Sequence, residues 1–160
     1  MAVVETLMLA NHVEALSGLL YIHGGGWSHH WRPDAPPGQL PPSQVGIAVT
    51  FLIPAAEAGL THSFVLRLVA DPDGEEVMRL EGTFGVAVDP GNPDAAQRTA
   101  LGANVTVGFP RPGRYLARAE VPGVSEREVE FWVHDGPPGS QPGTQPAGPT
   151  EEGGTVPGYM

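Results

Sequence analysis

The sequence predicts an all-β fold, and specifically a single antiparallel β-sandwich of about seven to nine strands. The first observation is that apolar and polar residues alternate along several short segments, which is typical of strands with one buried face. The second is that turn-forming residues recur about every ten positions, a spacing typical of sandwiches and barrels. The third is that a helix is suggested only by residues 54–58, and that helix is very short.

The alternation locates the strands. The clearest is residues 45–53, in which every second residue is apolar: Val45, Ile47, Val49, Phe51 and Ile53. Comparable patterns predict strands within residues 78–88, 105–109, 115–121 and 129–133. Less regular apolar runs predict strands at residues 3–9, 18–23 and 62–70. Two longer polar stretches, residues 24–43 and 89–98, are expected to form loops at the ends of the sandwich, where binding residues often lie.

Turn chemistry separates these strands. Asp71-Pro72-Asp73-Gly74 is a strong turn signal, because proline fixes φ and glycine tolerates a positive φ. Arg111-Pro112-Gly113 and Val121-Pro122-Gly123 are further turns. If the strands that follow them pair, their charged residues would face each other across the sheet, with Arg114 and Arg118 against Glu126, Glu128 and Glu130.

The composition divides the chain into two parts. Residues 1–135 carry the strand patterns and form the β-sandwich domain. Residues 136–160 are rich in glycine and proline, contain two glutamates and have one valine as their only aliphatic residue beyond alanine. A segment of this composition cannot bury enough apolar surface to offset the entropy of ordering. We therefore expect a disordered, acidic C-terminal tail.

The charge and the residue types exclude several function classes. The net charge is −10, with 18 acids against 8 basic residues, which argues against nucleic acid and against anionic membrane surfaces as partners. The chain has no cysteine and no lysine, which excludes disulfides, thiolate zinc sites and catalysis by either nucleophile. It has no apolar run long enough to span a membrane, and Glu5 interrupts the apolar N-terminus, so a cytoplasmic location is expected.

Residues 19–27, LLYIHGGGW, resemble the oxyanion loop of the hormone-sensitive-lipase-like esterases. In that family a strand precedes the loop, and the resemblance implies Gly24 and Gly25 as backbone donors to an oxyanion. The nucleophile elbow G-x-S-x-G and the alternating helices of that fold are not found in this sequence. We interpret the resemblance as coincidental, and keep a small hydrolase using His23-Gly24-Gly25-Gly26 as an alternative.

The same region holds a cluster of histidines and tryptophans. His23, His29 and His30 are the candidate ligands of a metal ion, because neutral imidazoles bind zinc and copper. Neighbouring histidines on a strand point to opposite sides, however, which argues against a shared site. The second interpretation is a contact surface formed by Trp27, Trp31 and Arg32, since tryptophan and arginine are common at binding hot spots.

The order and spacing of several segments resemble a family of small, uncharacterised bacterial proteins that is known only as a domain of unknown function. The matching segments are GLLYIHGG at residues 18–25, DPDGE at 71–75, FPRPGRY at 109–115 and EFWV at 130–133. The resemblance covers about residues 3–134 and implies an immunoglobulin-like β-sandwich. It implies no catalytic residue and no cofactor.

The function that the sequence favours is a non-enzymatic binding or protein-interaction module. The sequence contains no visible nucleophile–base pair, no phosphate-binding loop and no paired carboxylates placed for acid–base chemistry. The expected partner is another protein or a second copy of the chain, with no cofactor. The esterase-like and the histidine-based metal-binding interpretations are the alternatives.

Overall fold

The computed structural model describes residues 1–33 and 35–136, which form nine strands in two sheets. The strands are, in chain order, β1 (Val3–Leu16), β2 (Leu19–Gly25), β3 (His29–Arg32), β4 (Ser43–Ile53), β5 (His62–Ala70), β6 (Glu76–Phe84), β7 (Gln97–Val107), β8 (Gly113–Val121) and β9 (Ser125–Asp135). A turn of 3₁₀ helix, η1 (Ala55–Glu57), lies at the predicted helical segment. The tail predicted at residues 136–160 lies outside the described residues, apart from Gly136.

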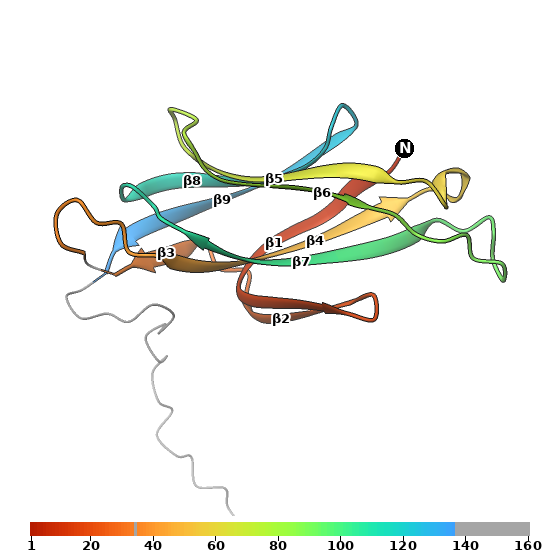
Figure 1. Ribbon diagram of the computed structural model, residues 1–160, viewed down its shortest axis with the longest axis horizontal. Coiled ribbons are helices and arrows are strands. Elements are labelled where there is room, and N and C mark those ends of the chain that lie inside the picture. Colours follow the sequence, from red (N-terminus) through yellow and green to blue (C-terminus); the bar gives the residue numbers. More distant parts are fainter. Residues whose placement is uncertain (34, 137–160) are drawn as a thin grey trace, which may run out of the picture.

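The two sheets pack face to face (Figure 1). One sheet has four strands in the order β2-β1-β4-β7, and the other has five in the order β3-β9-β8-β5-β6. The predicted all-β sandwich is confirmed. Its strand pairs are antiparallel with one exception, β3 with β9, which run parallel. A hairpin cannot join parallel strands, and β3 and β9 are accordingly far apart in the chain, with β4 to β8 between them.

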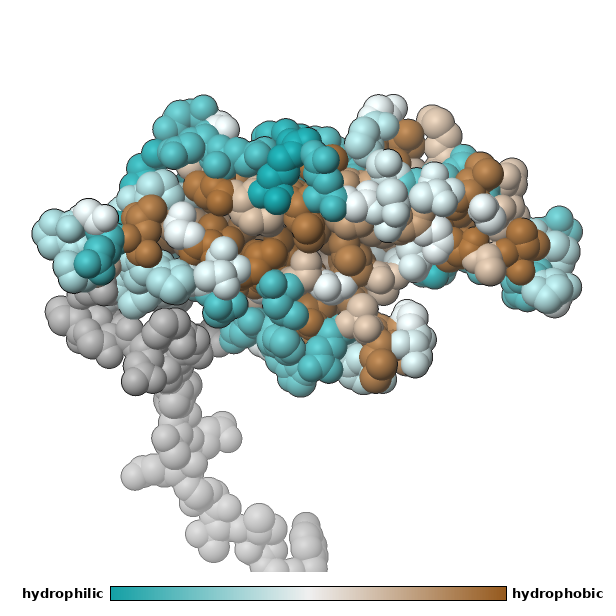
Figure 2. All heavy atoms as spheres, in the orientation of Figure 1, coloured by the Kyte–Doolittle hydropathy of each residue, from teal (hydrophilic) through white to brown (hydrophobic). Residues whose placement is uncertain are grey.

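The core lies between the sheets and follows the predicted alternation (Figure 2 shows apolar atoms gathered in the band between the two layers). The five residues of β4 that were predicted to share a face are all fully buried: Val45, Ile47, Val49, Phe51 and Ile53. Two groups of aromatic rings pack inside, namely Phe51, Phe64 and Phe84, and Phe109, Tyr115 and Phe131. Each fully buried side chain of this size stabilises the fold by about 1.5–3 kcal/mol.

The first two strands form a hairpin that the sequence did not reveal. Strands were predicted at residues 3–9 and 18–23, whereas β1 continues to Leu16 and pairs with β2 through a two-residue turn. Ser17 and Gly18 both have positive φ, 52° and 77°, which is the signature of a type I′ hairpin turn. The Ser-Gly dipeptide was the available signal for this turn.

The hairpin folds back over the outer face of the four-stranded sheet (Figure 1). Val13 packs there against Ala10 and Ala48 in a second small core that is separate from the main one. Two glycines permit this close approach. A Cβ atom on Gly46 would lie 3.0 Å from Val13 Cγ2, and one on Gly102 would lie 2.9 Å from Val13 Cγ1. Small residues on the outer face of the sheet therefore form the surface against which the hairpin packs.

Three predicted segments have different bounds in the structure. The strand predicted within residues 78–88 ends at Phe84, because Phe84 pairs with His62, the first residue of β5, and the later residues have no strand opposite them. The loop predicted at residues 24–43 contains the end of β2 and the whole of β3. The loop predicted at residues 89–98 overlaps the start of β7 at Gln97.

The outer face of the five-stranded sheet carries the predicted charge pairs. Arg118 lies opposite Glu128 in register, with 2.6 Å between Nε and Oε2, and Arg114 contacts Glu130 at 2.6 Å. The cross-strand pairing expected from the sequence is confirmed for these residues. Over residues 1–33 and 35–136, no helix is long and apolar enough to cross a membrane.

Candidate functional site

Strand β3 is an edge strand of the five-stranded sheet, and its residues alternate between the core and the solvent. It pairs in parallel with the end of β9, so that His29 lies opposite Trp132 and Trp31 lies opposite His134. His30 points inward and its ring lies 5.5 Å from that of Phe109. Because successive residues of a strand face opposite sides, His29 and Trp31 point outward.

Three of the residues predicted as site residues anchor this strand. Trp27 packs edge-on against Phe131, with 5.7 Å between ring centroids, and its ring also lies 5.6 Å from that of His30. Arg32 donates to Asp135 Oδ1 at 2.6 Å and to the carbonyl oxygen of Phe109 at 2.7 Å. Trp27, His30 and Arg32 therefore hold β3 on the sandwich, and a partner can reach little of them.

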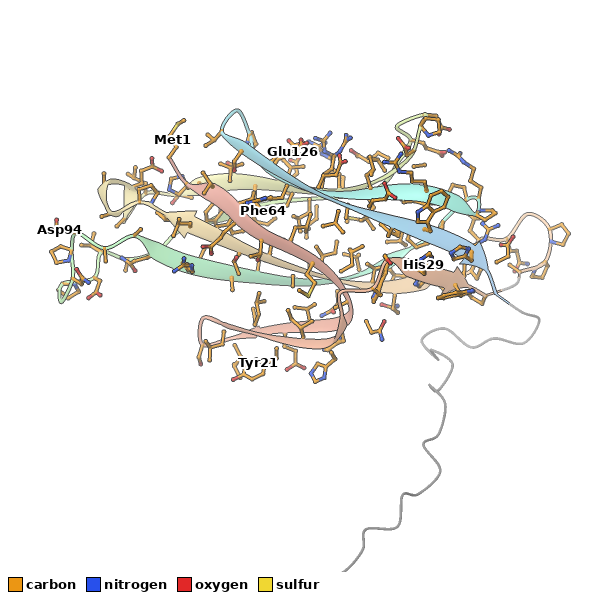
Figure 3. All side chains as sticks on the ribbon, turned by 180° about the vertical axis from the view of Figure 1, so that it is seen from behind. Met1, Tyr21, His29, Phe64, Asp94 and Glu126 are labelled. Carbon is orange, nitrogen blue, oxygen red and sulfur yellow. The ribbon has the colours of Figure 1, made fainter. Side chains whose placement is uncertain are left out.

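The outward residues of β3 and β9 form what we call the aromatic surface: His29, Trp31, Trp132 and His134. His29 and His134 stack, and His29 Nδ1 lies 2.8 Å from His134 Nε2. Trp31 stacks on His134 with 5.2 Å between ring centroids. Trp31 is 46% exposed and Trp132 is 41% exposed. Figure 3 shows His29 where these two strands lie side by side.

The histidines of this region differ in their hydrogen bonding. His29 and His134 share a hydrogen bond in which one ring nitrogen donates and the other accepts. Burial lowers the pKa of His30, and its Nε2 has no hydrogen-bond partner. Beneath the aromatic surface, burial therefore disfavours the charged form of His30.

The three histidines predicted as metal ligands are not brought together. His23 lies on β2 in the other sheet, where its ring centroid is 6.0 Å from that of His12. His29 and His30 point to opposite sides of β3, as their adjacency in the sequence predicted. Within the described part of the chain, no group of three or more histidine or acidic side chains could hold a metal ion.

The glycine-rich segment does not form a separate loop. His23, Gly24 and Gly25 are the last residues of β2, and the N–H of Gly26 donates to the carbonyl oxygen of Leu9 at 2.8 Å. Asn11 fills the space beside Gly24, where a Cβ atom would lie 2.4 Å from Asn11 Nδ2. This setting is unlike the strand–loop–helix context in which such segments form oxyanion holes.

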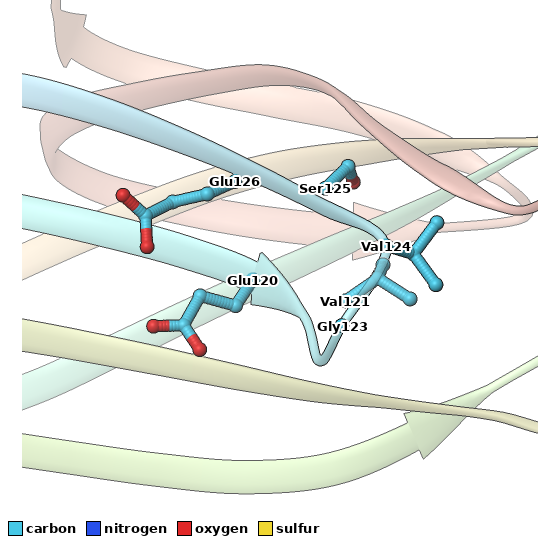
Figure 4. Close-up of a pocket in the computed structure, with 6 residues that line it drawn as sticks. All are labelled: Glu120, Val121, Gly123, Val124, Ser125 and Glu126. Atoms are coloured by element: carbon cyan, nitrogen blue, oxygen red, sulfur yellow. The ribbon is translucent and has the colours of Figure 1, made fainter.

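A shallow hollow of about 280 Å³ lies at the turn between β8 and β9 (Figure 4). It is lined by Glu120, Val121, Gly123, Val124, Ser125 and Glu126, and Figure 4 shows the two carboxylates extending in the same direction from adjacent strands. Ser125 Oγ accepts a hydrogen bond from the backbone N–H of Val4 at 2.8 Å, and no histidine is among the lining residues. Ser125 thus uses its hydroxyl to bind the backbone of β1, and no hydrogen bond to a histidine or to either glutamate activates it among the described residues.

The sequence alone did not predict that Trp132 and His134 lie beside the predicted contact residues. Both lie more than 100 positions from β3, and only the parallel pairing with β9 brings them together. The alternation of Phe131, Trp132, Val133 and His134 was the available signal, since it places the tryptophan and the histidine on the outward face.

A family model matches residues 5–134, almost the whole described part of the chain. A search of curated proteins found no match, and a search of solved structures found none. The resemblance to an uncharacterised family is confirmed, whereas a bacterial distribution and an immunoglobulin-like classification stay predictions. The chain belongs to DUF6941, a family of unknown function.

Proposed function

We propose that this protein is a non-enzymatic binding module and that the aromatic surface is where its partner binds. One observation carries the proposal: two half-exposed tryptophans and two stacked histidines lie together on the outer face of a sheet whose other outward residues are mostly charged. Clustered exposed aromatic side chains are common at protein interaction sites, and tryptophan is among the residues that contribute most to binding energy.

The anchoring of β3 supports this function. Binding is weakened when side chains or loops must be ordered, and a surface held in place before binding avoids part of that cost. Arg32 ties β3 to both Asp135 and Phe109, and Trp27 packs beneath it on Phe131. The outward rings are thus supported from below by groups that have low exposure.

The polar groups around the aromatic surface fit an interface rim. Trp132 Nε1 donates to Glu130 Oε1 at 3.3 Å, and Glu130 is in turn held by Arg114. Asp135, the last residue of β9, lies beyond His134 and pairs with Arg32. An apolar centre with charged residues at its border is the usual arrangement of a protein–protein contact.

A photo-crosslinking experiment tests the proposal. A photoreactive amino acid replaces Trp31 in one variant and Thr83 in a matched control, because Thr83 is exposed on β6, the opposite edge of the same sheet. In the protein's own host we expect a defined crosslinked partner from position 31 and none from position 83. The additional substitution Trp132→Ala should abolish the crosslink. Equal crosslinking from both positions, or a crosslink at 31 that survives Trp132→Ala, would contradict the proposal.

The metal-binding alternative has one supporting observation, which is the 2.8 Å separation of His29 Nδ1 and His134 Nε2. Two imidazoles supply only half of the four ligands of a typical zinc site, so further ligands would come from water or from a partner. Zinc titration followed by the imidazole NMR signals tests it, with His134→Gln as the variant. Saturable shifts of both imidazoles that disappear in His134→Gln would support a metal site, and unchanged signals would exclude one.

A further inference from the structure

Four strands lie at the sheet edges of the described structure, and they differ in how they are protected. Natural proteins usually place charged residues on edge strands or keep them short, because an open edge can pair with another chain. The edge strand β6 carries Glu76, Arg79 and Glu81, and the edge strand β7 carries Arg98. The edge strand β3 has only four residues and ends in Arg32. The edge strand β2, with the sequence LLYIHGG, has no acidic residue, no arginine and no proline.

The unprotected strand is also apolar and exposed. Leu19 is 60% exposed, Tyr21 is 47% exposed and Ile22 is 37% exposed, and Leu16 on the other side of the hairpin turn is 62% exposed. Figure 2 shows apolar atoms at the tip of this hairpin, and Figure 3 shows Tyr21 on the side that faces away from the sandwich. Such a combination of open edge and apolar side chains marks a strand that pairs with another chain.

The hairpin turn determines which backbone N–H and C=O groups of β2 are free to pair with another chain. Leu16 and Leu19 flank a two-residue turn and pair with each other, so the N–H and C=O groups of Leu19 point toward β1. Backbone groups alternate in direction along an antiparallel strand, and those of Leu20 and Ile22 therefore point to the free edge. Tyr21 lies between them.

We propose that β2 pairs antiparallel with β2 of a second copy of this chain, across a two-fold axis at Tyr21. Leu20 of each copy then lies opposite Ile22 of the other and exchanges backbone hydrogen bonds with it, while the two Tyr21 residues form the central pair. The strand is self-complementary in this register at its centre, since Leu20, Tyr21 and Ile22 meet only one another, and Leu19 of each copy lies opposite His23 of the other. The two four-stranded sheets would join into one continuous sheet.

Charge favours this edge for contact between identical chains. Each chain has a net charge of −10, so two copies repel one another over most of their surfaces. Pairing at β6 would bring acidic side chains of the two copies to the contact, and β7 carries Arg98 near its start, whereas β2 has no acidic residue and no arginine along its whole length. A second copy is therefore the occupant that this strand fits.

Cysteine crosslinking of the full chain tests the pairing and its register. The chain has no cysteine, so Tyr21→Cys introduces a single thiol per copy. Residues opposite each other in a non-hydrogen-bonded pair have Cα atoms about 4.5 Å apart, which lies within the disulfide range. Under mild oxidation we expect Tyr21→Cys to form a dimer rapidly, Ile22→Cys slowly and the edge-strand control Thr83→Cys not at all. Equal rates at all three positions, or a faster reaction at position 22, would overturn the proposed pairing.

Sedimentation equilibrium of the unmodified chain gives the second test. We expect a reversible monomer–dimer equilibrium, weakened about tenfold or more by Ile22→Lys and unaffected by Thr83→Lys. The backbone amides of Leu20 and Ile22 in the unmodified chain should exchange with solvent more slowly as its concentration increases. A chain that stays monomeric at all concentrations, with exchange independent of concentration, would overturn the proposal even if the lysine variant fails to fold.

Discussion

The side-chain amide of Asn104 takes the place of a neighbouring strand for the backbone of Val13. Asn104 Nδ2 donates to the carbonyl oxygen of Val13 at 2.7 Å, and the N–H of Val13 donates to Asn104 Oδ1 at 2.9 Å. Val13 belongs to the hairpin and Asn104 to the sheet beneath it. This pair of hydrogen bonds fixes the hairpin, and with it the exposed strand β2, on the outer face of the four-stranded sheet.

Loss of this amide should destabilise the protein. Asn104→Ala leaves the partly buried N–H and C=O groups of Val13 without partners, for which we expect a decrease of about 1–3 kcal/mol in the free energy of unfolding. Gln44→Ala is the matched control, because Gln44 makes only an exposed hydrogen bond to Thr106 on the same sheet. Urea unfolding of both variants measures the difference, and equal stability of the two would contradict this role of Asn104.

A side chain at Gly102, where the hairpin packs on the sheet, should displace the hairpin. Gly102→Ala places a Cβ atom 2.9 Å from Val13 Cγ1 and 3.3 Å from the backbone nitrogen of Ala15, and overpacking of this kind costs about 1–3 kcal/mol. Adding Val13→Ala should recover part of the loss, because it removes the closest contact. Thermal unfolding of the single and double variants measures the coupling, and strictly additive effects would show that Val13 is not the residue in conflict.

The stability should depend on pH through His30. Its pKa is lowered by burial, so the unfolded chain binds the proton more tightly than the folded one. Its contribution to stability is therefore complete above the ordinary histidine pKa of about 6.5 and decreases as the pH falls below it. His30→Phe should reduce the loss of stability between neutral and mildly acidic pH, as measured by urea unfolding at several pH values. Parallel pH profiles for the wild type and His30→Phe would refute this assignment.

Two arginines with similar hydrogen bonding should differ in their effect on stability. Arg32 is largely buried and bonds to both Asp135 and the carbonyl oxygen of Phe109, so Arg32→Ala should cost about 1–3 kcal/mol and loosen β3. Arg98 makes three hydrogen bonds to Glu5, but its side chain is 64% exposed, and solvent screens such exposed pairs, so Arg98→Ala should change the stability much less. Urea unfolding compares them, and a larger loss in Arg98→Ala would contradict the anchoring role of Arg32.

Alternation in the sequence was sufficient to predict most strands and the main core. The buried residues of β4, from Val45 to Ile53, follow a strict period of two, and the charge pair Arg118–Glu128 follows from the pairing of two amphipathic strands. The hairpin was missed because the first strand was predicted to end at residue 9, since residues 10–16 show no regular alternation of apolar and polar residues.

The aromatic surface could be predicted only in part. Trp31 and His29 were identified as candidates, but Trp27 and Arg32 have structural contacts that no local pattern reveals. Strand β3 was missed because it has only four residues, and its partner β9 lies at the far end of the chain. Parallel pairing over such a sequence separation is a property of the tertiary structure.

The most direct test of the binding function is oxidative footprinting of the three tryptophans, carried out once on the purified protein and once inside the cells that produce it. In the purified protein Trp31 and Trp132 should be modified readily and Trp27 weakly, because Trp27 packs against the core. If the aromatic surface binds a partner, Trp31 and Trp132 should be protected inside cells while Trp27 does not change. Equal modification of Trp31 and Trp132 in the two settings would contradict the proposed function.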